Sequence, residues 1–437
     1  MPANLTKLHK NTIIRTVRDD GIFSGNYGRN PKCCTASSEV GRNSIHMENY
    51  KVQEQKVIKY IGNGKHASVP EGITRIGWEA FFGCTELVSI SLPDTITHID
   101  DHAFSHCTNL ISINLPESLL TLAPNCFESC CSLTEIFIPP SIETIPVLAF
   151  KNCTNLTSVH MMNGLQSIGF AAFANCSSLV TVNIPDSVMG IESSAFEDCN
   201  SLQTFICAPG LTEFGMDVFS GTALLQNHPE DFLNINGTLI RYLGDKPAVN
   251  IPEGIRKIGS RVIGNTQQIC TLTIPEGVTE IGDWAFSGCS ASSVSLPDCV
   301  IKIGAYAFSD CKGIDEIHLP TSLIGIGYSA FTNCTNLRSI TIPNGVKELK
   351  QGIFSDCRSL EHVVIGSSVR AIQMNVFENC IHLRTISIGE QTKKIAMLAF
   401  SGVQKPITIL GVSGSFAEEF SFRHGHVFKS CPTGKPT

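Results

Sequence analysis

A phenylalanine recurs every 23 residues along this chain, with one step of 22. The first run is Phe81, Phe104, Phe127, Phe150, Phe173, Phe196 and Phe219, and the second, which opens on Ile263, is Phe286, Phe308, Phe331, Phe354, Phe377 and Phe400. A period in the twenties is typical of a solenoid, in which each coil buries its apolar face only against the next coil. The period therefore predicts one stack of seven plus seven coils instead of separate globular cores.

One unit, Pro93 to Leu115, serves as the template for the coil. Its apolar or small positions should point inward, and they are Ile96, Ile99, Ala103, Phe104, Cys107, Leu110, Ile113 and Leu115. The stretch from Leu110 to Leu115 carries the L-x-x-I-x-L spacing of a leucine-rich repeat strand, so Ser112 and Asn114 should stand on the opposite face. A proline follows most of these strands and ends the strand there, because it lacks an N–H donor for the hydrogen bonds between strands.

Two further pieces complete the predicted coil. The segment Val-x-x-Ile-Gly, as in Val278 to Gly282, predicts a second short strand, and x-x-Ala-Phe-x-x-Cys predicts a single tight helical turn that brings the chain back. The expected fold class is α/β, a leucine-rich repeat solenoid: a curved, right-handed stack of coils with a parallel β-sheet on its concave face.

The repeat pattern divides the chain into five segments. Residues 1–50 share none of it and are expected to be poorly ordered, 51–220 hold the first seven coils, 221–250 form an insertion, 251–406 hold the second seven coils and 407–437 form a C-terminal cap and tail. The insertion should contain a hairpin around Asn236-Gly237, a pair that tolerates the positive φ angles of a two-residue turn. The cap should contain a helix that begins after Ser413 or Ser415 and ends at Gly425.

Composition excludes several classes of function. A net charge of −7, with 16 % charged residues and no basic stripe, offers nothing to nucleic acid. No apolar run reaches the length of a transmembrane helix, so membrane insertion is not expected. The first thirty residues contain no apolar run long enough for a signal peptide, which together with free thiols favours a cytoplasmic protein, a cell-surface location being the alternative.

Cysteine is unusually frequent, and the repeat explains why. Eleven of the nineteen cysteines occupy the position three residues after the repeated phenylalanine or its equivalent. We expect a ladder of buried, reduced thiols, each acting as a small apolar side chain with a weak donor for a nearby backbone carbonyl. Parallel side chains in register rarely meet the dihedral angle that a disulfide requires.

No motif for catalysis or for a cofactor is present. His98, His102 and His106 have a spacing that can bind metal, but the repeat frame makes a surface position the better interpretation. Searches for H-E-x-x-H, phosphate-binding glycine loops and G-x-S-x-G find nothing. We therefore expect no enzyme activity, no catalytic residue, no cofactor and no metal.

The outward positions of the repeat strands are the surface that a solenoid offers to partners. Fourteen of these twenty-four positions are Ser or Thr, and none is Lys or Arg. Such a face suits neutral hydrogen bonding to a protein or a polysaccharide, although Ser and Thr are also ordinary strand formers. Phe137, His160 and Ile206 depart from the pattern and are the candidate partner contacts of an expected monomer.

The unit beginning at Ile274, IPEGVTEIGDWAFSGCSASSVSLP, resembles the BspA-like leucine-rich repeat family, and the resemblance covers about 350 to 370 of the 437 residues. It implies a non-enzymatic binding scaffold. The leading functional hypothesis is a protein-interaction scaffold that binds through the concave face. The alternative is a cell-surface adhesin or carbohydrate-binding protein whose export signal is missing from this sequence.

Overall fold

The computed structural model describes residues 45–263, 269–404 and 406–431. The chain divides into two compact units, Met1–Asn43 and Ser44–Thr437, and only the second contains described residues. Most of the segment expected to be poorly ordered, 1–50, thus lies outside the described residues. Strands nevertheless begin at Ile45, before the boundary expected at residue 50.

Most coils contribute one strand to each of two parallel ladders on opposite sides of the coil, and each ladder is divided into several sheets. The first ladder, made by the strands that precede the proline position, consists of β4 (His66–Ser68), β6 (Ser89–Ser91), β8 (Ser112–Ile113), β10 (Glu135–Ile138), β12 (Ser158–Met161), β14 (Thr181–Asn183), β16 (Thr204–Ile206), β20 (Ala248–Asn250), β22 (Thr271–Thr273), β24 (Ser293–Ser295), β27 (Ser339–Ile342), β29 (His362–Ile365), β31 (Thr385–Ser387), β33 (Thr408–Gly411) and β34 (Val427–Ser430). Between β24 and β27 the ladder continues through isolated bridges at Glu316.

The second ladder is made by the two-residue strands that the Val-x-x-Ile-Gly segments predicted. Its members are β5 (Arg75–Ile76), β7 (His98–Ile99), β9 (Thr121–Leu122), β11 (Thr144–Ile145), β13 (Ser167–Ile168), β15 (Gly190–Ile191), β17 (Glu213–Phe214), β21 (Lys257–Ile258), β23 (Glu280–Ile281), β25 (Lys302–Ile303), β26 (Gly325–Ile326), β28 (Glu348–Leu349), β30 (Ala371–Ile372) and β32 (Lys394–Ile395). Within the described residues, seven of these strands precede the insertion and seven follow it.

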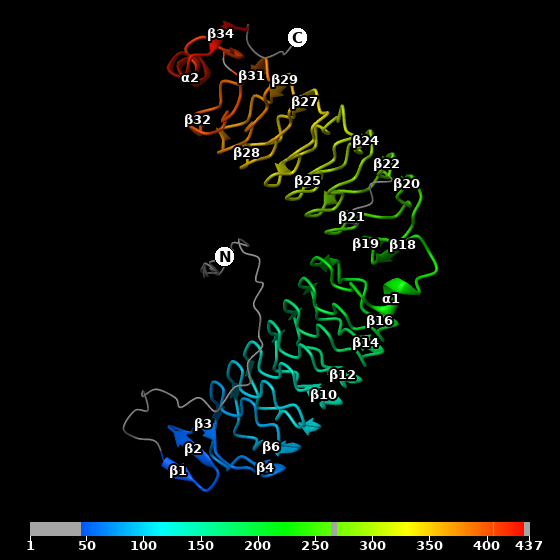
Figure 1. The fold of residues 1–437 in the computed structure, drawn as a ribbon, viewed down its shortest axis with the longest axis vertical. Helices are drawn as coiled ribbons and strands as arrows, with labels where there is room; N and C mark the ends of the chain where they lie inside the picture. Colours follow the sequence, from blue (N-terminus) through cyan, green and yellow to red (C-terminus); the bar gives the residue numbers. More distant parts are fainter. Residues whose placement is uncertain (1–44, 264–268, 405, 432–437) are drawn as a thin grey trace, which may run out of the picture. The chain divides into compact units, whose positions relative to one another are not determined.

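The solenoid fold is confirmed, but the side taken by each ladder corrects one expectation. Within the unit Ser44–Thr437, Figure 1 shows β10, β12, β14 and β16 along the outer edge of the curved stack, and β21, β25, β28 and β32 along its inner edge. The parallel sheet on the concave side is therefore the second ladder, and the strands that carry Phe137, His160 and Ile206 lie on the other side. The L-x-x-I-x-L spacing sets the register of a strand, whereas the direction of bending depends on the relative widths of the two sides of each coil.

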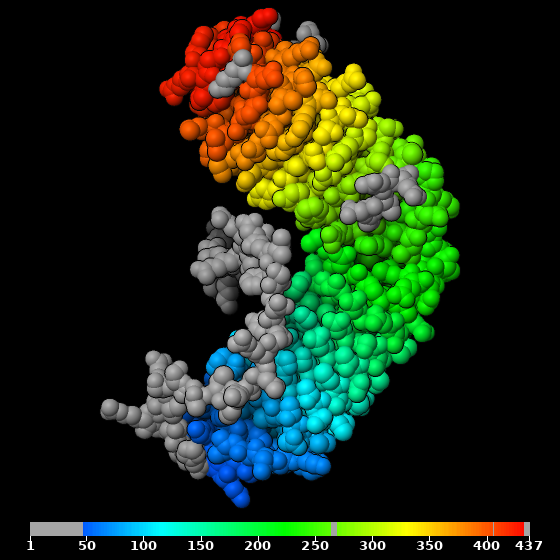
Figure 2. Space-filling model, in the orientation of Figure 1, coloured from blue at the N-terminus to red at the C-terminus, as the bar shows by residue number. Residues whose placement is uncertain are grey.

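The repeated phenylalanines form two stacked columns of rings inside the coils. From Phe81 to Phe219 the centroids of successive rings are 4.9 to 6.1 Å apart. From Phe286 to Phe400 they are 5.3 to 5.9 Å apart. Neighbouring coils are thus held by ring stacking as well as by backbone hydrogen bonds. Figure 2 shows the coils of the unit Ser44–Thr437 packed against one another in sequence order.

The template coil is confirmed at each of its eight inward positions, which are all buried. The expected helical turn around Ala-Phe is not helical. The residues flanking it take left-handed backbone angles instead, as His102 (φ 55°) and His106 (φ 61°) do in the template coil. In most other coils the later of these two positions holds Asn, Asp or Gly, residues that tolerate such angles. Helix is confined, among the described residues, to α1 (Ala223–Gln226) and α2 (Phe416–His424).

The insertion forms the predicted hairpin and interrupts the stack. Strands β18 (Phe232–Ile235) and β19 (Thr238–Tyr242) pair antiparallel around Asn236 (φ 53°) and Gly237 (φ 79°). The buried side chains form two clusters that meet here, because Leu233 packs with the first set of coils and Leu239 with the second. Strand β19 pairs with β21 on one side, but in the described part of the chain it makes no ladder with β17.

Both ends of the described stack are covered. At the start, β1 (Ile45–Met47), β2 (Tyr50–Gln53) and β3 (Lys56–Tyr60) form an antiparallel sheet that joins β5, and the Tyr60 ring stacks on Phe81 at 5.0 Å. At the other end, α2 begins after Ser415 and ends at Gly425, as expected. Its Phe420 ring lies 5.8 Å from Phe400, the last ring of the column. Neither helix in the described residues has the length and apolar content needed to cross a bilayer.

Candidate functional site

Phe137 and His160, two of the three candidate partner contacts, lie next to each other on the first ladder. Strands β10 and β12 pair in a register that places Phe137 directly beside His160. Their rings stack with centroids 4.2 Å apart and planes 8° apart. Phe137 keeps 49 % of its surface exposed. Because strand side chains alternate between core and surface, the neighbours Ile136 and Ile138 are buried while Phe137 points to solvent.

A carboxylate completes this small cluster. Glu135 lies two residues before Phe137 on the same face of β10, and its Oε1 is 2.6 Å from Nε2 of His160. The imidazole is thereby held flat against the Phe137 ring by a hydrogen bond at its edge. An exposed aromatic pair fixed in this way loses little side-chain entropy when a partner binds, which is a property of contact centres.

Ile206, the third candidate partner contact, lies in the same column of outward positions. It makes no recorded contact with the ring of Phe137 or of His160. Strands β14 and β16 pair with Asn183 beside Ile206, so one coil separates Ile206 from His160. Ile206 is 54 % exposed. The column Phe137, His160, Asn183 and Ile206 thus carries apolar surface at both ends and a polar amide between them.

Hydroxyls line much of the rest of the first ladder, and two of them are bonded across coils to histidine. His66 Nδ1 lies 2.8 Å from the Ser89 hydroxyl, and His362 Nδ1 lies 2.7 Å from the Thr385 hydroxyl. These hydrogen bonds join adjacent coils on an exposed surface. They leave donors and acceptors of hydrogen bonds on either side of the Phe137–His160 pair.

Most of the thiol ladder is buried and chemically quiet. Nine thiols each donate a hydrogen bond of 3.0 to 3.2 Å to a phenylalanine carbonyl oxygen in the preceding coil: those of Cys107, Cys130, Cys153, Cys176, Cys199, Cys311, Cys334, Cys357 and Cys380. Burial raises the pKa of the Cys130, Cys334 and Cys357 thiols well above the ordinary value. A nucleophilic thiol requires a lowered pKa, so these side chains serve packing.

The spaced histidines do not form a cluster of ligands. His98 Nδ1 lies 2.8 Å from the Thr97 hydroxyl, while His102 and His106 place their rings edge-on against Phe82. Throughout residues 45–263, 269–404 and 406–431, no group of three or more His, Cys, Asp or Glu side chains could hold a metal ion.

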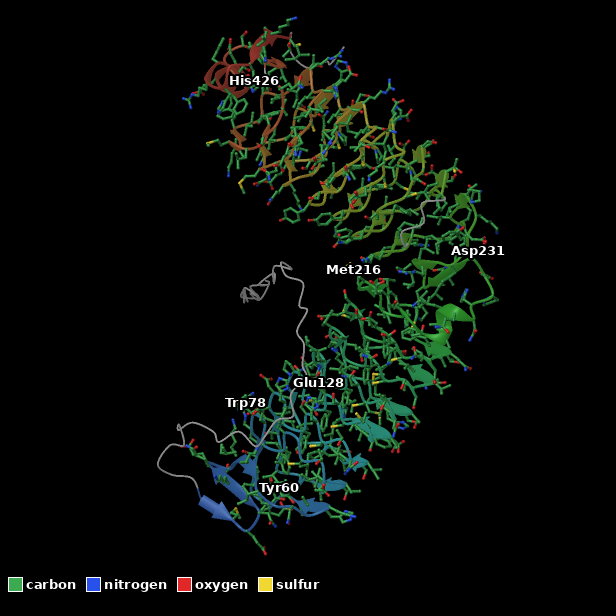
Figure 3. All side chains as sticks on the ribbon, viewed as in Figure 1. Tyr60, Trp78, Glu128, Met216, Asp231 and His426 are labelled. Carbon is green, nitrogen blue, oxygen red and sulfur yellow. The ribbon has the colours of Figure 1, made fainter. Side chains whose placement is uncertain are left out.

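A second surface feature was missed by the sequence analysis. The position directly after Ile-Gly, or its equivalent, carries large exposed apolar side chains in several coils: Trp78, Val147, Phe170, Tyr328, Met374 and Met397. Figure 3 shows Trp78, Glu128 and Met216 on the inner side of the stack, and Asp231 on the opposite side. The residue directly after Ile-Gly in each repeat is the sequence signal that indicates this pattern.

The comparisons with known proteins agree with this architecture. The sequence matches the family described as BspA type Leucine rich repeat region (6 copies) over residues 54–176, 123–240, 240–361 and 286–406. No curated protein matches it.

Several solved structures also match this chain. A leucine rich cell surface protein from Faecalibacterium prausnitzii A2-165 is 23 % identical, with 91 % of this chain and 100 % of that chain covered and a TM-score of 0.39. A leucine-rich repeat protein from Bacteroides ovatus ATCC 8483 is 21 % identical, with coverages of 83 % and 99 % and a TM-score of 0.38. The pneumococcal vaccine antigen PcpA is 19 % identical, with coverages of 91 % and 100 % and a TM-score of 0.43. Since the family match extends from residue 54 to residue 406, this chain belongs to the BspA type leucine-rich repeat family.

Proposed function

We propose that this protein is a non-enzymatic scaffold that binds a protein partner through the exposed face of the first ladder, with Phe137, His160 and Ile206 at the centre of the contact. The observation that carries the proposal is the exposed, stacked pair of Phe137 and His160. The concave face was the expected location, but the proposed contact follows these three residues to the other side of the coils.

The chemistry around the pair favours a protein surface as the ligand. Aromatic side chains are enriched in the cores of protein interfaces, and a rim of groups that donate and accept hydrogen bonds completes such a contact. The flanking coils supply that rim as Ser and Thr hydroxyls. The twenty-four outward positions that the sequence analysis assigned to these strands contain no Lys or Arg, so this part of the face lacks the cations that a phosphate-rich ligand needs.

A cell-surface adhesin or carbohydrate-binding role is the second candidate. The observation that favours it is the long row of hydroxyls on the same face, which could bond the hydroxyl groups of a polysaccharide. The two candidates differ in what Phe137 and Ile206 contribute. A protein contact needs both apolar side chains, whereas a polysaccharide that follows the hydroxyl row would tolerate their loss.

Affinity capture with matched variants tests the proposal. The full chain, the double variant Phe137→Ser with Ile206→Ser, and the control Met397→Ser would each be immobilised and exposed to the same protein extract. Met397 is a suitable control because it is a highly exposed apolar side chain on a distant coil. We expect specific partners to be lost with the double variant and retained with the control. Unchanged recovery by the double variant would remove the proposed contact centre.

A further inference from the structure

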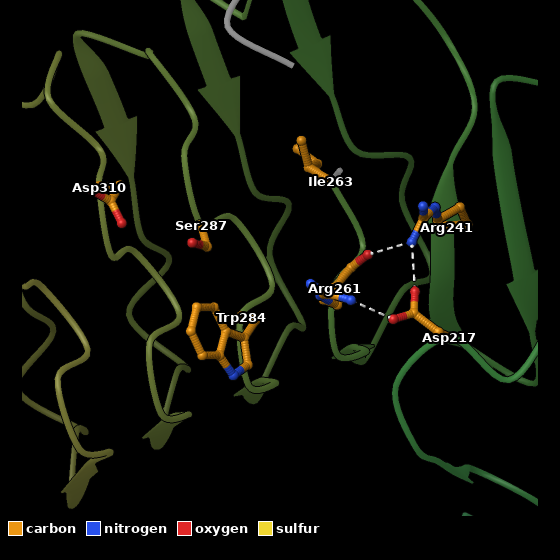
Figure 4. A pocket seen from close by; sticks show the side chains of 7 residues that line it. All are labelled: Asp217, Arg241, Arg261, Ile263, Trp284, Ser287 and Asp310. Carbon is orange, nitrogen blue, oxygen red and sulfur yellow. Dashed lines mark hydrogen bonds and ion pairs between the residues drawn. The ribbon is translucent and has the colours of Figure 1, made fainter. Parts of the chain in front are cut away.

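A hollow lies where the hairpin meets the second set of coils, on the side of the second ladder. Its volume is about 410 Å³, and it is lined by Asp217, Arg241, Arg261, Ile263, Trp284, Ser287 and Asp310 (Figure 4). These side chains come from coils on both sides of the hairpin and from the hairpin itself. The volume is at the lower end of the range for small-ligand sites, which suits a ligand the size of one or two sugar rings.

One wall of the hollow is an ion-paired group in which one carboxylate faces two guanidinium groups. Asp217 Oδ1 lies 3.2 Å from Nη1 of Arg241, and Asp217 Oδ2 lies 2.6 Å from Nη1 of Arg261. Arg241 also donates from Nη1 to the carbonyl oxygen of Arg261, 3.0 Å away. Asp217 is thus shared by both guanidinium groups, and an incoming phosphate or sulfate would have to compete with it.

The facing wall is aromatic. The Trp284 ring stacks on Tyr306 of the following coil, with centroids 4.1 Å apart and planes 13° apart. Strand β23, which leads into Trp284, lies between β21 and β25, so the ring face opposite Tyr306 is turned toward the coil that carries Arg261. This open face is flat and apolar, and it borders the hollow (Figure 4).

The two rings sit at a backbone position that is left-handed in nearly every coil, where Leu148 and Arg261 also occur. Trp284 (φ 58°) and Tyr306 (φ 55°) both adopt left-handed angles, as do Asn125 and Asn375 at the same position of other coils. Asparagine tolerates this conformation well, whereas large aromatic residues are genuine outliers there.

Polar groups surround the aromatic face. The Ser287 hydroxyl lies 2.8 Å from the Ser309 hydroxyl, and Asp310 Oδ1 accepts a hydrogen bond of 2.6 Å from the Asn333 amide. These bonds orient the two side chains and leave the second carboxylate oxygen of Asp310 as an acceptor at the rim. The exposed guanidinium of Arg261 supplies donors on the opposite rim.

We propose that this hollow binds one ring of a neutral saccharide, with the apolar face of a pyranose on Trp284 and its hydroxyl groups bonded to Asp310, Ser287 and Arg261. The four charged side chains of the lining, Asp217, Asp310, Arg241 and Arg261, sum to no net charge, which favours an uncharged ligand. An anion would meet two arginines already paired with Asp217, and a cation that stacked on Trp284 would lie beside the Arg261 guanidinium. A flat, uncharged ligand ringed by hydroxyls meets neither obstacle.

The inference goes beyond the proposed protein contact and does not depend on it. Phe137, His160 and Ile206 lie on the first ladder before the hairpin, and none of them lines the hollow. A variant that loses saccharide binding should therefore still capture the protein partner. A variant that loses the protein partner should still bind the saccharide.

Tryptophan fluorescence offers a direct test, because the chain contains only two tryptophans, Trp78 and Trp284. In Trp78→Phe the emission reports on Trp284 alone. Maltohexaose, cellohexaose and chitohexaose serve as neutral probes, with a heparin oligosaccharide as the anionic probe and hexalysine as the cationic probe. We expect a saturable change in emission with at least one neutral probe and none with the charged probes. No change with any neutral probe at millimolar concentrations, or stronger binding of a charged probe, would overturn the proposal.

A second variant assigns the binding to the aromatic wall. Trp284→Asn removes the ring but keeps a residue that suits the left-handed backbone, so the coil should still fold. By isothermal titration calorimetry we expect this variant to bind the active saccharide about tenfold more weakly or worse. Trp78→Phe should bind it like the original chain. Equal affinity of Trp284→Asn and the original chain would place the saccharide elsewhere and refute the assignment.

Discussion

The thiol of Cys334 donates a hydrogen bond to the backbone carbonyl oxygen of Phe308, 3.1 Å away in the preceding coil. The same carbonyl accepts the amide of Cys311 within its own coil. Each such thiol therefore links the turn of one coil to the ring column of the coil before it. The repeat of cysteine three residues after phenylalanine thus has a structural cause. The hydrogen bond from the thiol predicts how loss of a cysteine changes the free energy of unfolding.

Cys334→Ala should lower the free energy of unfolding by about 1 to 2 kcal/mol, because it removes a buried hydrogen bond and leaves a small void. Urea unfolding followed by circular dichroism measures the change. Cys270→Ala is the matched control, since Cys270 is exposed and its loss should change the free energy by less than about 0.5 kcal/mol. Equal effects of the two substitutions would show that the ladder thiols contribute nothing specific.

Alkaline pH should destabilise the stack. Burial raises the thiol pKa in the folded state for Cys126, Cys130, Cys153, Cys176, Cys289, Cys311, Cys334, Cys357 and Cys380. Above about pH 8.5 the unfolded chain loses thiol protons that the folded chain keeps, so this contribution to stability is complete below that pH and falls as pH rises. The limiting slope is about 1.4 kcal/mol per pH unit for each thiol.

Urea unfolding at pH 8, 9 and 10 tests this expectation, and Cys357→Ala should show a shallower decline than the original chain. Stability that is independent of pH across this range would mean that the buried thiols titrate normally in the folded state.

The ring columns should dominate the stability of each coil. Phe331→Ala removes a fully buried ring that stacks on Phe308 and Phe354, and should cost about 3 to 5 kcal/mol. Phe82→Ala is the control, because Phe82 is exposed although it directly follows a column residue. Denaturant midpoints measure both, and a small effect of Phe331→Ala would contradict the stacking of coils through their rings.

Phe137 and His160 should contribute to the free energy of unfolding in a coupled way. In a double-mutant cycle with Phe137→Ala and His160→Ala, we expect a coupling free energy of about 0.5 to 1 kcal/mol, typical of stacked cross-strand pairs. The corresponding cycle with Phe137→Ala and Ile206→Ala should show no coupling, because a coil separates the two residues. Coupling of similar size in both cycles would indicate a change in the whole ladder instead of a contact between two rings.

The sequence was sufficient for the parts of the fold that follow from periodicity. The inward positions of the template coil, the two strands of each coil, the turn at Asn236-Gly237 and the cap helix that ends at Gly425 were all predicted, because each depends on local residue chemistry. The role of the thiols was likewise predictable, since one fixed position after a buried ring leaves room only for a small side chain.

Other features depend on geometry that a single repeat does not encode. The side toward which the stack bends results from small differences in width summed over many coils. The left-handed turns were mistaken for helix because His102 and Trp284 are poor indicators of positive φ. The hollow beside Trp284 joins residues from coils that the hairpin separates in sequence, so no local pattern indicates it. The role of Phe137, His160 and Ile206 remains a prediction.

Amide hydrogen exchange along the chain is the most direct test of the central claim, that each coil is held by its neighbours and that the hairpin divides the stack into two blocks. The Phe104 amide, bonded to the carbonyl of Cys126 at 2.8 Å, represents the bonds that cross from coil to coil. We predict strong protection of such amides at every coil, two blocks with different opening free energies, and a boundary between Ala223 and Tyr242. Uniform exchange with no boundary, or column amides that exchange as fast as exposed ones, would contradict the account.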